Sequence, residues 1–200
     1  MQPYKFKTIN NRILPIRDYS EHDVIPFFAL DTTGVAGTFV SPTSFNPNDT
    51  DGMSDTPVGA EFDGVHSFRY EVRNKVTAAT SGATKFDVLG ITLNDTREYD
   101  ENGNRLIYNP QKKLEMQCVL SGEAVPIVTR GYFALISGAY EGTPAIGKVG
   151  CISHTTPGAI AAVAPEDLTS EGFSEDQVLG KFLSSSGDGH GGYAIFKLEL

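Results

Sequence analysis

The chain is short of several residue types and patterns that mark common protein classes. Its 200 residues include no tryptophan and two cysteines, and its apolar runs end well before the ~18 residues of a membrane-spanning helix. The opening residues, MQPYKFKTINNR, contain no apolar stretch of the kind found in a secretory signal. We therefore expect a soluble protein that is made in the cytoplasm and crosses no membrane.

The two cysteines, Cys118 and Cys151, both lie in apolar, strand-like runs. Free cysteines behave as small buried apolar residues, and disulfides belong to oxidising compartments. Because nothing in the sequence indicates secretion, we expect two buried free thiols. A disulfide between them is the alternative.

Motifs of the common enzyme classes are also missing. No G-x-S-x-G, P-loop or dinucleotide fingerprint occurs. The segment Ser184–His190 holds the residue types of a Ser-His-Asp triad, but a contiguous glycine-rich turn does not fix triad geometry. The four histidines are far apart and none flanks a cysteine, so they predict no zinc site: His22, His66, His154 and His190. We expect no enzymatic activity, no cofactor and no bound metal.

One acidic segment resembles a calcium-binding loop superficially. When NPNDTDG (46–52) is aligned with an EF-hand, Pro47 takes the first ligand position and Val58 the twelfth, where a glutamate is needed. An EF-hand is therefore excluded. A looser site remains as the alternative, formed by Asp49, Asp51 and Asp55.

Acidic residues outnumber basic ones. There are 25 Asp and Glu against 16 Lys and Arg, for a formal charge of -9 and an isoelectric point near 4.8. A charge of this sign repels nucleic acid and anionic lipid, so we expect neither as a partner. The densest basic pair, Lys112-Lys113, is expected to be a solvated turn.

The patterns that are present favour short strands. Gly occurs 21 times and Pro 11 times, which suits tight turns better than long helices. Apolar or alternating runs predict strands at 24–30, 37–40, 66–76, 86–93, 114–120, 124–136, 147–152, 160–163, 178–183 and 193–200. Asn102-Gly103 predicts a hairpin turn, and a helical turn is expected only at 165–177. These elements predict an all-β fold, a small antiparallel β-barrel or sandwich, in one domain over 24–200.

One glycine and one proline refine this prediction. Gly90 inside a strand predicts a bulge or a close backbone approach, and Pro126 predicts that its strand begins at a sheet edge. The pattern V-L-G-x-x-L occurs at 88–93 and again at 178–183, which predicts two equivalent hairpins. Edge strands such as 125–136 and the C-terminal strand need covering, which favours self-association.

Two segments stand apart from the predicted strands. Residues 1–23 have irregularly spaced apolar residues and predict an extended arm that binds a partner; an edge strand on the chain's own domain is the alternative. Residues 41–64 predict a long acidic loop, of a length that is usually functional or disordered. The candidate partner-binding residues in these segments are Tyr4, Phe6, Ile9, Ile13, Leu14, Ile16, Phe45 and Met53.

The strand sequences resemble the capsid decoration, or cement, proteins of tailed bacteriophages. The resemblance covers residues 20–200 and lies in EHDVIPFFALD with GTFV, VLGITLND, SGEAVPIVTRGYFALI, TPAIGKVG and VLGKFLSSSGDGHGGYAIFKLEL. It implies a β-tulip-like fold that oligomerises on a capsid lattice. The chain departs from that family by its long loop at 41–64.

The resemblance also implies a function. The chain would be a structural virion protein that binds the outer capsid surface and stabilises it. Its partners would be the major capsid protein and further copies of itself, most simply as a homotrimer on a three-fold position. The alternative is a head-fibre or tail-associated module that binds a receptor or carbohydrate, against which the absence of tryptophan counts.

Overall fold

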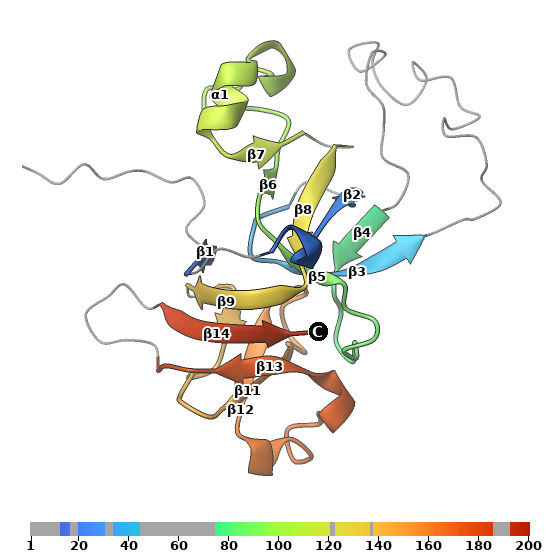
Figure 1. The fold of residues 1–200 in the computed structure, drawn as a ribbon, viewed down its shortest axis with the longest axis vertical. Coiled ribbons are helices and arrows are strands. Elements are labelled where there is room, and N and C mark those ends of the chain that lie inside the picture. The colour runs from blue at the N-terminus through green and yellow to red at the C-terminus, as the bar shows by residue number, and fades with distance from the viewer. Residues whose placement is uncertain are drawn as a thin grey trace, which may run out of the picture.

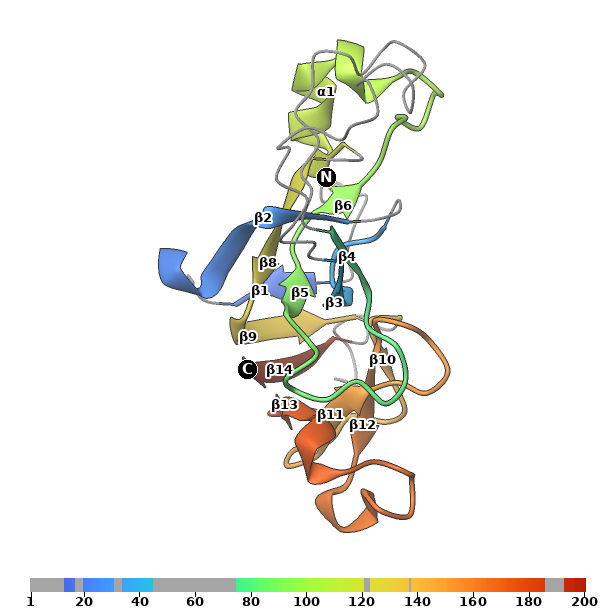
Figure 2. The same cartoon turned by 90° about the vertical axis from the view of Figure 1, so that its right-hand side faces the viewer.

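The structure is a computed structural model that describes residues 13–16, 20–30, 34–44, 75–120, 123–136, 138–185 and 193–200. Strands make up most of the regular secondary structure in the described residues, with one short α-helix, which confirms the predicted all-β class. Along the long axis, Figures 1 and 2 show a small insert at one end, a β-barrel beside it, then a larger sheet, and loops of the C-terminal third at the other end.

The barrel is closed, with strand order β2-β4-β3-β5-β8. A 3-10 turn, η1 (Glu21–Asp23), leads into it. Its strands are β2 (Val24–Leu30), β3 (Phe39–Ser44), β4 (Lys75–Ala78), β5 (Gly90–Thr92) and β8 (Ala124–Val128). Its interior is filled by Leu30, Val40, Val76, Val125 and Ile127. The β2–β4 pair is parallel and the other pairs are antiparallel, so the barrel is mixed rather than purely antiparallel.

The larger sheet has seven strands in the order β1-β9-β14-β13-β11-β12-β10. They are β1 (Ile13–Pro15), β9 (Arg130–Leu135), β10 (Tyr140–Glu141), β11 (Val149–Ile152), β12 (Ile160–Val163), β13 (Val178–Phe182) and β14 (Ala194–Glu199). Two 3-10 turns, η3 (Pro165–Asp167) and η4 (Glu175–Gln177), lie between β12 and β13, where a helical turn was predicted.

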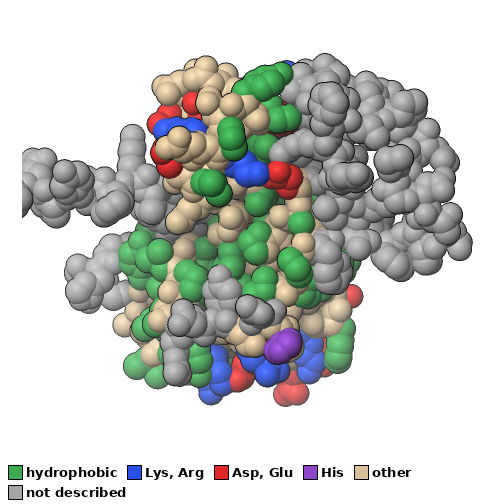
Figure 3. Space-filling model, turned by 45° about the horizontal axis from the view of Figure 1, so that its top comes forward, with side chains coloured by type: hydrophobic (Ala, Val, Ile, Leu, Met, Phe, Trp, Pro, Cys, Tyr) green, Lys and Arg blue, Asp and Glu red, His purple; other side chains and the backbone are tan. Residues whose placement is uncertain are grey.

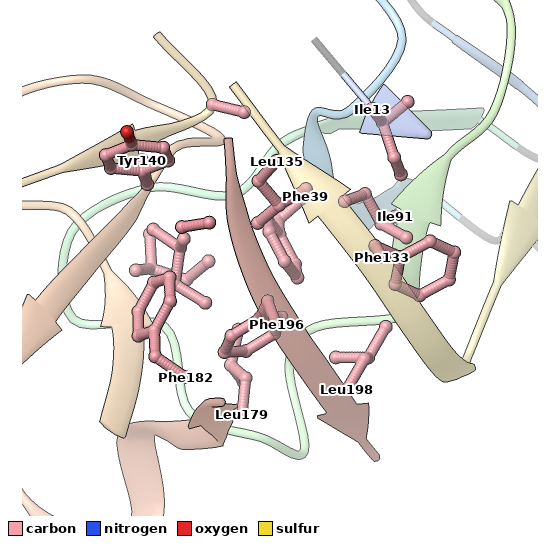
Figure 4. Packing of buried hydrophobic residues seen from close by; sticks show 14 of the residues in the cluster. Ile13, Phe39, Ile91, Phe133, Leu135, Tyr140, Leu179, Phe182, Phe196 and Leu198 are labelled. Atoms are coloured by element: carbon pink, nitrogen blue, oxygen red, sulfur yellow. The ribbon is translucent and has the colours of Figure 1, made fainter. Parts of the chain in front are cut away.

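One face of this sheet packs against the barrel. Aromatic rings from both units meet there in an edge-on or tilted row, which we call the aromatic row: Phe39, Phe196, Phe182 and Tyr140. The Phe39–Phe196 ring centroids are 6.1 Å apart and the Phe196–Phe182 centroids 5.0 Å, which are favourable aromatic geometries. Figure 4 shows these rings within a larger apolar cluster, together with Ile91 of the barrel and Leu135 of the sheet.

Two glycines make room for the central ring of the row. Gly150 on β11 and Gly180 on β13 are directly opposite each other. A Cβ atom on Gly150 would meet the Ile160 side chain and would lie 2.6 Å from the Phe196 ring. One on Gly180 would lie 2.8 Å from that ring and would overlap the carbonyl oxygen of Lys197. The pair therefore keeps both positions free of side chains so that Phe196 can occupy the space.

The repeated V-L-G-x-x-L pattern marks close approaches rather than equivalent hairpins. A Cβ on Gly90 would overlap the carbonyl oxygen of Val128, as one on Gly180 would overlap that of Lys197. The close approach predicted for Gly90 is thus confirmed. The two copies lie in different units, β5 in the barrel and β13 in the sheet, so the predicted equivalence of the hairpins is wrong.

The insert between β5 and β8 differs most from prediction. It holds β6 (Asp95–Thr96), η2 (Leu106–Tyr108), α1 (Pro110–Glu115) and β7 (Cys118–Val119). The strand expected at 114–120 is therefore mostly a helix end and turn, and Leu114 is 74% exposed. Met116, Cys118 and Leu120 are buried with Leu106 in a small core of their own. The Asn102-Gly103 turn does form, with a single bridge between Tyr99 and Arg105.

The predicted edge strands are interior strands. β8 pairs with both β2 and β5, and β14 lies between β9 and β13. Pro126 is tolerated in β8 because the β2–β8 register shifts between Ile25 and Phe28, leaving two residues of β2 opposite it in a bulge. The run expected as one strand at 124–136 is divided between β8 of the barrel and β9 of the sheet.

The remaining predictions differ in outcome. The strands at 24–30, 160–163, 178–183 and 193–200 are confirmed as β2, β12, β13 and β14. Only residues 90–92 of the expected 86–93 strand are in β5, and Phe86 is exposed in a turn. β3 extends to Ser44, so the first residues of the predicted 41–64 loop belong to a strand. The rest of that loop and most of the 66–76 strand lie outside the described residues.

Substituting Gly180 tests the role of the glycine pair. Gly180→Ala should lower the free energy of unfolding by about 2–3 kcal/mol, because backbone and ring must both move to admit the new methyl group. Gly103→Ala is the control, since a Cβ there meets nothing within 4 Å and only the left-handed φ of 79° opposes it, at a cost of about 1–2 kcal/mol. Urea unfolding measures both. Equal losses would contradict the steric account.

A second prediction concerns the joint between insert and barrel. Asp95, which is 1% exposed, accepts a hydrogen bond from the Ala36 amide at 2.8 Å and pairs with the Arg97 guanidinium at 2.9 Å. Asp95→Asn should lower the free energy of unfolding by about 2–3 kcal/mol. The one oxygen of an asparagine amide cannot accept from both the Ala36 amide and the Arg97 guanidinium, and the charge of Arg97 would lose its partner.

Its neighbour supplies a matched control. The buried Thr96 hydroxyl has no hydrogen-bond partner within the described part of the chain. Thr96→Val should therefore change stability by less than about 1 kcal/mol. Thermal and urea unfolding compare the two variants, and a loss in Thr96→Val as large as in Asp95→Asn would show that the Asp95 bonds are not what holds the insert.

Candidate functional site

The outer face of the seven-stranded sheet, opposite the aromatic row, carries a line of apolar side chains. Cross-strand pairing places Leu14 beside Ala134 and Ala134 beside Ile195. Leu183 continues the line, because its amide donates to the Ile195 carbonyl one position beyond the Phe182–Phe196 pair. These four residues come from β1, β9, β14 and the end of β13. We call the outer surface of these strands the open half.

The other half of the outer face is covered. The segment 164–177, which we call the cap, packs Leu168 and Phe173 over side chains of β11 and β12. The covered set comprises Cys151, Val163, Val149, Ala161 and Val178. Because Val149 pairs directly with Lys181 of β13, the covered half and the open half are continuous parts of one sheet face.

Charge is distributed unevenly over this face. β1, β9, β14 and β13 carry three cations, Arg130, Lys181 and Lys197, against a single carboxylate, Glu199. Lys181 and Lys197 are direct cross-strand partners, an arrangement that like charges normally disfavour. A chain with a net charge of -9 thus has a locally positive open half.

Glu199 is the one acidic group among these cations. Its hydrogen bond from Lys197 holds the pKa of Glu199 below its usual value against partial desolvation, and the charges of Lys197, Lys181 and Arg130 act in the same direction. The same bond raises the pKa of Lys197. Lys197 also lies over the Tyr132 ring, 5.9 Å from its centroid. Arg130 and Lys181 form no ion pair within the described residues.

The cap has the opposite charge. Between Lys148 and Lys181 the sequence contains no lysine or arginine. Five carboxylates in the cap are exposed: Glu166, Asp167, Glu171, Glu175 and Asp176.

On the face drawn in Figure 3, hydrophobic side chains gather across the middle and charged side chains lie toward the two ends. An exposed apolar line with unbalanced charge beside it is typical of a protein-binding surface.

The candidate residues of the N-terminal segment that the structure describes differ in burial. Ile13 is 5% exposed and belongs to the main core, because β1 pairs with β9 along the sheet edge. At Ile13 the prediction of an arm outside the core is therefore wrong, and the edge-strand alternative is observed. Leu14 and Ile16 are 42% and 47% exposed and lie at the rim of the open half. The other candidates, Tyr4, Phe6, Ile9, Phe45 and Met53, lie outside the described residues.

A serine and a histidine meet at the surface beside the cap. Ser81 Oγ is hydrogen-bonded to His154 Nδ1, and the His154 ring stacks on Phe173 with centroids 4.1 Å apart. No carboxylate is bonded to this histidine within the described residues, so the arrangement there lacks the third group of a triad. The contact ties the cap to the 80–88 turn.

The earlier triad candidate has a different arrangement. Ser184 accepts a hydrogen bond from the Ile195 amide at 2.9 Å, which closes the connection between β13 and β14. Asp188 and His190 lie outside the described residues. The Ser184 hydroxyl thus has a structural role. A structural turn was the alternative to a catalytic triad at this segment.

Two other kinds of site are absent from the described residues. In that part of the chain, no three His, Cys, Asp or Glu side chains cluster closely enough to bind a metal. The loop aspartates Asp49, Asp51 and Asp55 lie outside the described residues. The described helices include none long and apolar enough for a membrane span.

Comparison with known proteins adds no assignment: no protein-family model matches the chain, and no curated protein matches it. The candidate surface therefore rests on geometry and charge.

Both cysteines are free and buried, which confirms the prediction. Cys151 lies under the cap, and burial raises the pKa of its thiol to about 11. At pH 8 only about one thiol in a thousand would be ionised, so alkylation in the native state should be very slow. Burial also raises the pKa of Cys118.

This makes Cys151 a reporter of the cap. Phe173→Ala removes a ring that covers it, and should speed iodoacetamide labelling of Cys151 at pH 8 by about tenfold or more through local opening. Labelling of Cys118, in the separate core of the insert, should not change. Peptide mass spectrometry distinguishes the two sites. Equal acceleration at both cysteines would indicate general loosening and contradict the assignment of the cap as the cover.

Proposed function

We propose that the chain is a structural protein that binds the outer surface of a bacteriophage capsid and stabilises it. The observation that carries this proposal is the position of Leu14 and Ile16. They are exposed on a strand that fastens the N-terminal segment to the sheet edge. A segment anchored in this way can carry apolar and basic residues to a neighbouring surface while the β-domain remains folded.

The sequence before the anchor fits a docking role. Tyr4, Phe6 and Ile9 are apolar residues separated by polar ones, and Lys5 and Lys7 lie among them. Extended segments bind by placing such side chains in separate pockets of a partner. Opposite potentials speed the encounter when the partner is acidic. The resemblance to decoration proteins supports the major capsid protein as that partner.

A second exposed apolar surface supports a connecting role. At the far end of the molecule, Tyr108 and Leu114 of the insert are 69% and 74% exposed. Two apolar surfaces at separate places on one β scaffold favour a protein that contacts more than one neighbour. A single ligand-binding module, which is the alternative function, needs one such surface.

Removing residues 1–12 tests the proposal. The deletion keeps Ile13 and the β1–β9 pairing, so the protein should stay folded with a melting temperature within a few degrees of the full chain. Binding to empty mature capsids that lack the protein should fall by about tenfold or more, because the docking side chains are gone. Co-sedimentation with the capsids measures this.

Leu14→Asp with Ile16→Asp should weaken binding in the same direction, since both side chains are exposed at the base of the segment. Phe86→Asp is the matched control, because Phe86 is 81% exposed in a turn and belongs to neither apolar surface. If the shortened chain binds capsids as well as the full chain does, the proposal that residues 1–12 dock on the capsid is wrong. No binding by the full chain, with binding to host-surface glycans instead, would favour the receptor-binding alternative.

A further inference from the structure

Within the described residues, the cations of the open half outnumber the carboxylates beside them, because Glu199 is the one acidic residue on these strands and lies opposite Arg130. Arg130 and Lys181 are exposed, and within the described residues neither takes part in an ion pair. Lys181 faces Lys197 across the β13–β14 pair, and Glu199, the one carboxylate that the described strands of the open half carry, already bonds to Lys197. Repulsion between the two lysines weakens the sheet slightly, and it would be relieved by carboxylates from another molecule.

The cap carries such carboxylates. Its five acidic side chains are exposed, and in the described part of the chain none of them forms an ion pair. The cap cannot fold over the open half of its own chain, because Leu168 and Phe173 hold it against β11 and β12. Its carboxylates therefore stay on the covered half of the face, where they can meet the open-half cations of another copy.

From this complementarity we propose that the open half of one copy binds the cap of a second copy of this chain. The apolar line of Ala134, Ile195 and Leu183 would be covered at the same contact. A two-fold pair satisfies the contact twice, because each copy contributes one cap and one open half, and such self-complementary contacts are common in homo-oligomers. A closed ring satisfies it once per subunit. The proposal does not depend on capsid docking, which we assign to the N-terminal segment.

Salt dependence is the first part of the test. Sedimentation equilibrium of the full chain at about 0.05 M and about 0.5 M salt should show self-association that weakens as salt screens the opposed charges. A chain that is monomeric at both salt concentrations, at about 100 µM protein, would overturn the proposal. Association that strengthens at high salt would overturn it also, because contacts between apolar surfaces alone behave in that way.

Charge exchange is the second part. The face variant carries Arg130→Glu and Lys181→Glu, so that its open half repels every cap. The cap variant carries Glu171→Lys and Glu175→Lys, so that its cap repels every open half. Each variant alone should associate at least about tenfold more weakly than the wild type. An equimolar mixture should recover association, because the acidic face of one meets the basic cap of the other, and the unchanged cap and face also match.

The control variant carries Arg105→Glu and Lys112→Glu, which change the net charge as much as the face variant does but lie in the insert, outside both surfaces. It should associate like the wild type. All substituted side chains of the face and cap variants are exposed, and circular dichroism checks that each variant is folded. Failure of the mixture to recover, or equal weakening by the control variant, would contradict the proposal. If one variant misfolds, sedimentation equilibrium of the wild type at the two salt concentrations still tests the proposal.

Discussion

The fold depends on the aromatic row that joins the barrel to the seven-stranded sheet. Phe196 is its centre, in contact with Phe39 of the barrel and with Phe182 of the neighbouring strand. Its ring fits only because Gly150 and Gly180 leave both positions beside it without side chains. Aromatic rings bury more area than other side chains, so a row of them supplies much of the burial that holds two sheets together. The inner face of the sheet is thereby fully used.

This constraint assigns different roles to the two faces. Since the inner face is committed to the barrel, the outer face needs another cover, and the described residues supply one for half of it. The cap buries β11 and β12 and the thiol of Cys151, while the apolar line through Ile195 stays at the surface. The strands of the open half carry three cations and one carboxylate, although the chain as a whole is acidic. Unbalanced cations do not stabilise the fold, so a role in binding a partner is the simpler explanation.

Local patterns predicted the strands well where one face of the strand is buried. In β14 the residues Phe196 and Leu198 alternate with Lys197 and Glu199, and the strand forms as expected. The same kind of alternation failed at 114–120, where apolar residues instead meet in the small core of the insert. The signal that could have indicated α1 is Pro110 at the first helical turn, since proline is favoured there. The open half could not be predicted, because Leu14, Ala134 and Ile195 are far apart in the sequence and become neighbours only through strand register.

The division between a structural inner face and a binding outer face is tested most directly by methyl resonances of isoleucine. Ile195 lies on the outer face of β14, and Ile160 is fully buried on the inner side. In a methyl-labelled sample that is diluted stepwise at low salt, the resonance of Ile195 should shift with protein concentration while that of Ile160 stays constant. Two resonances that both stay constant, or an inner-face methyl that moves with the outer one, would contradict the account.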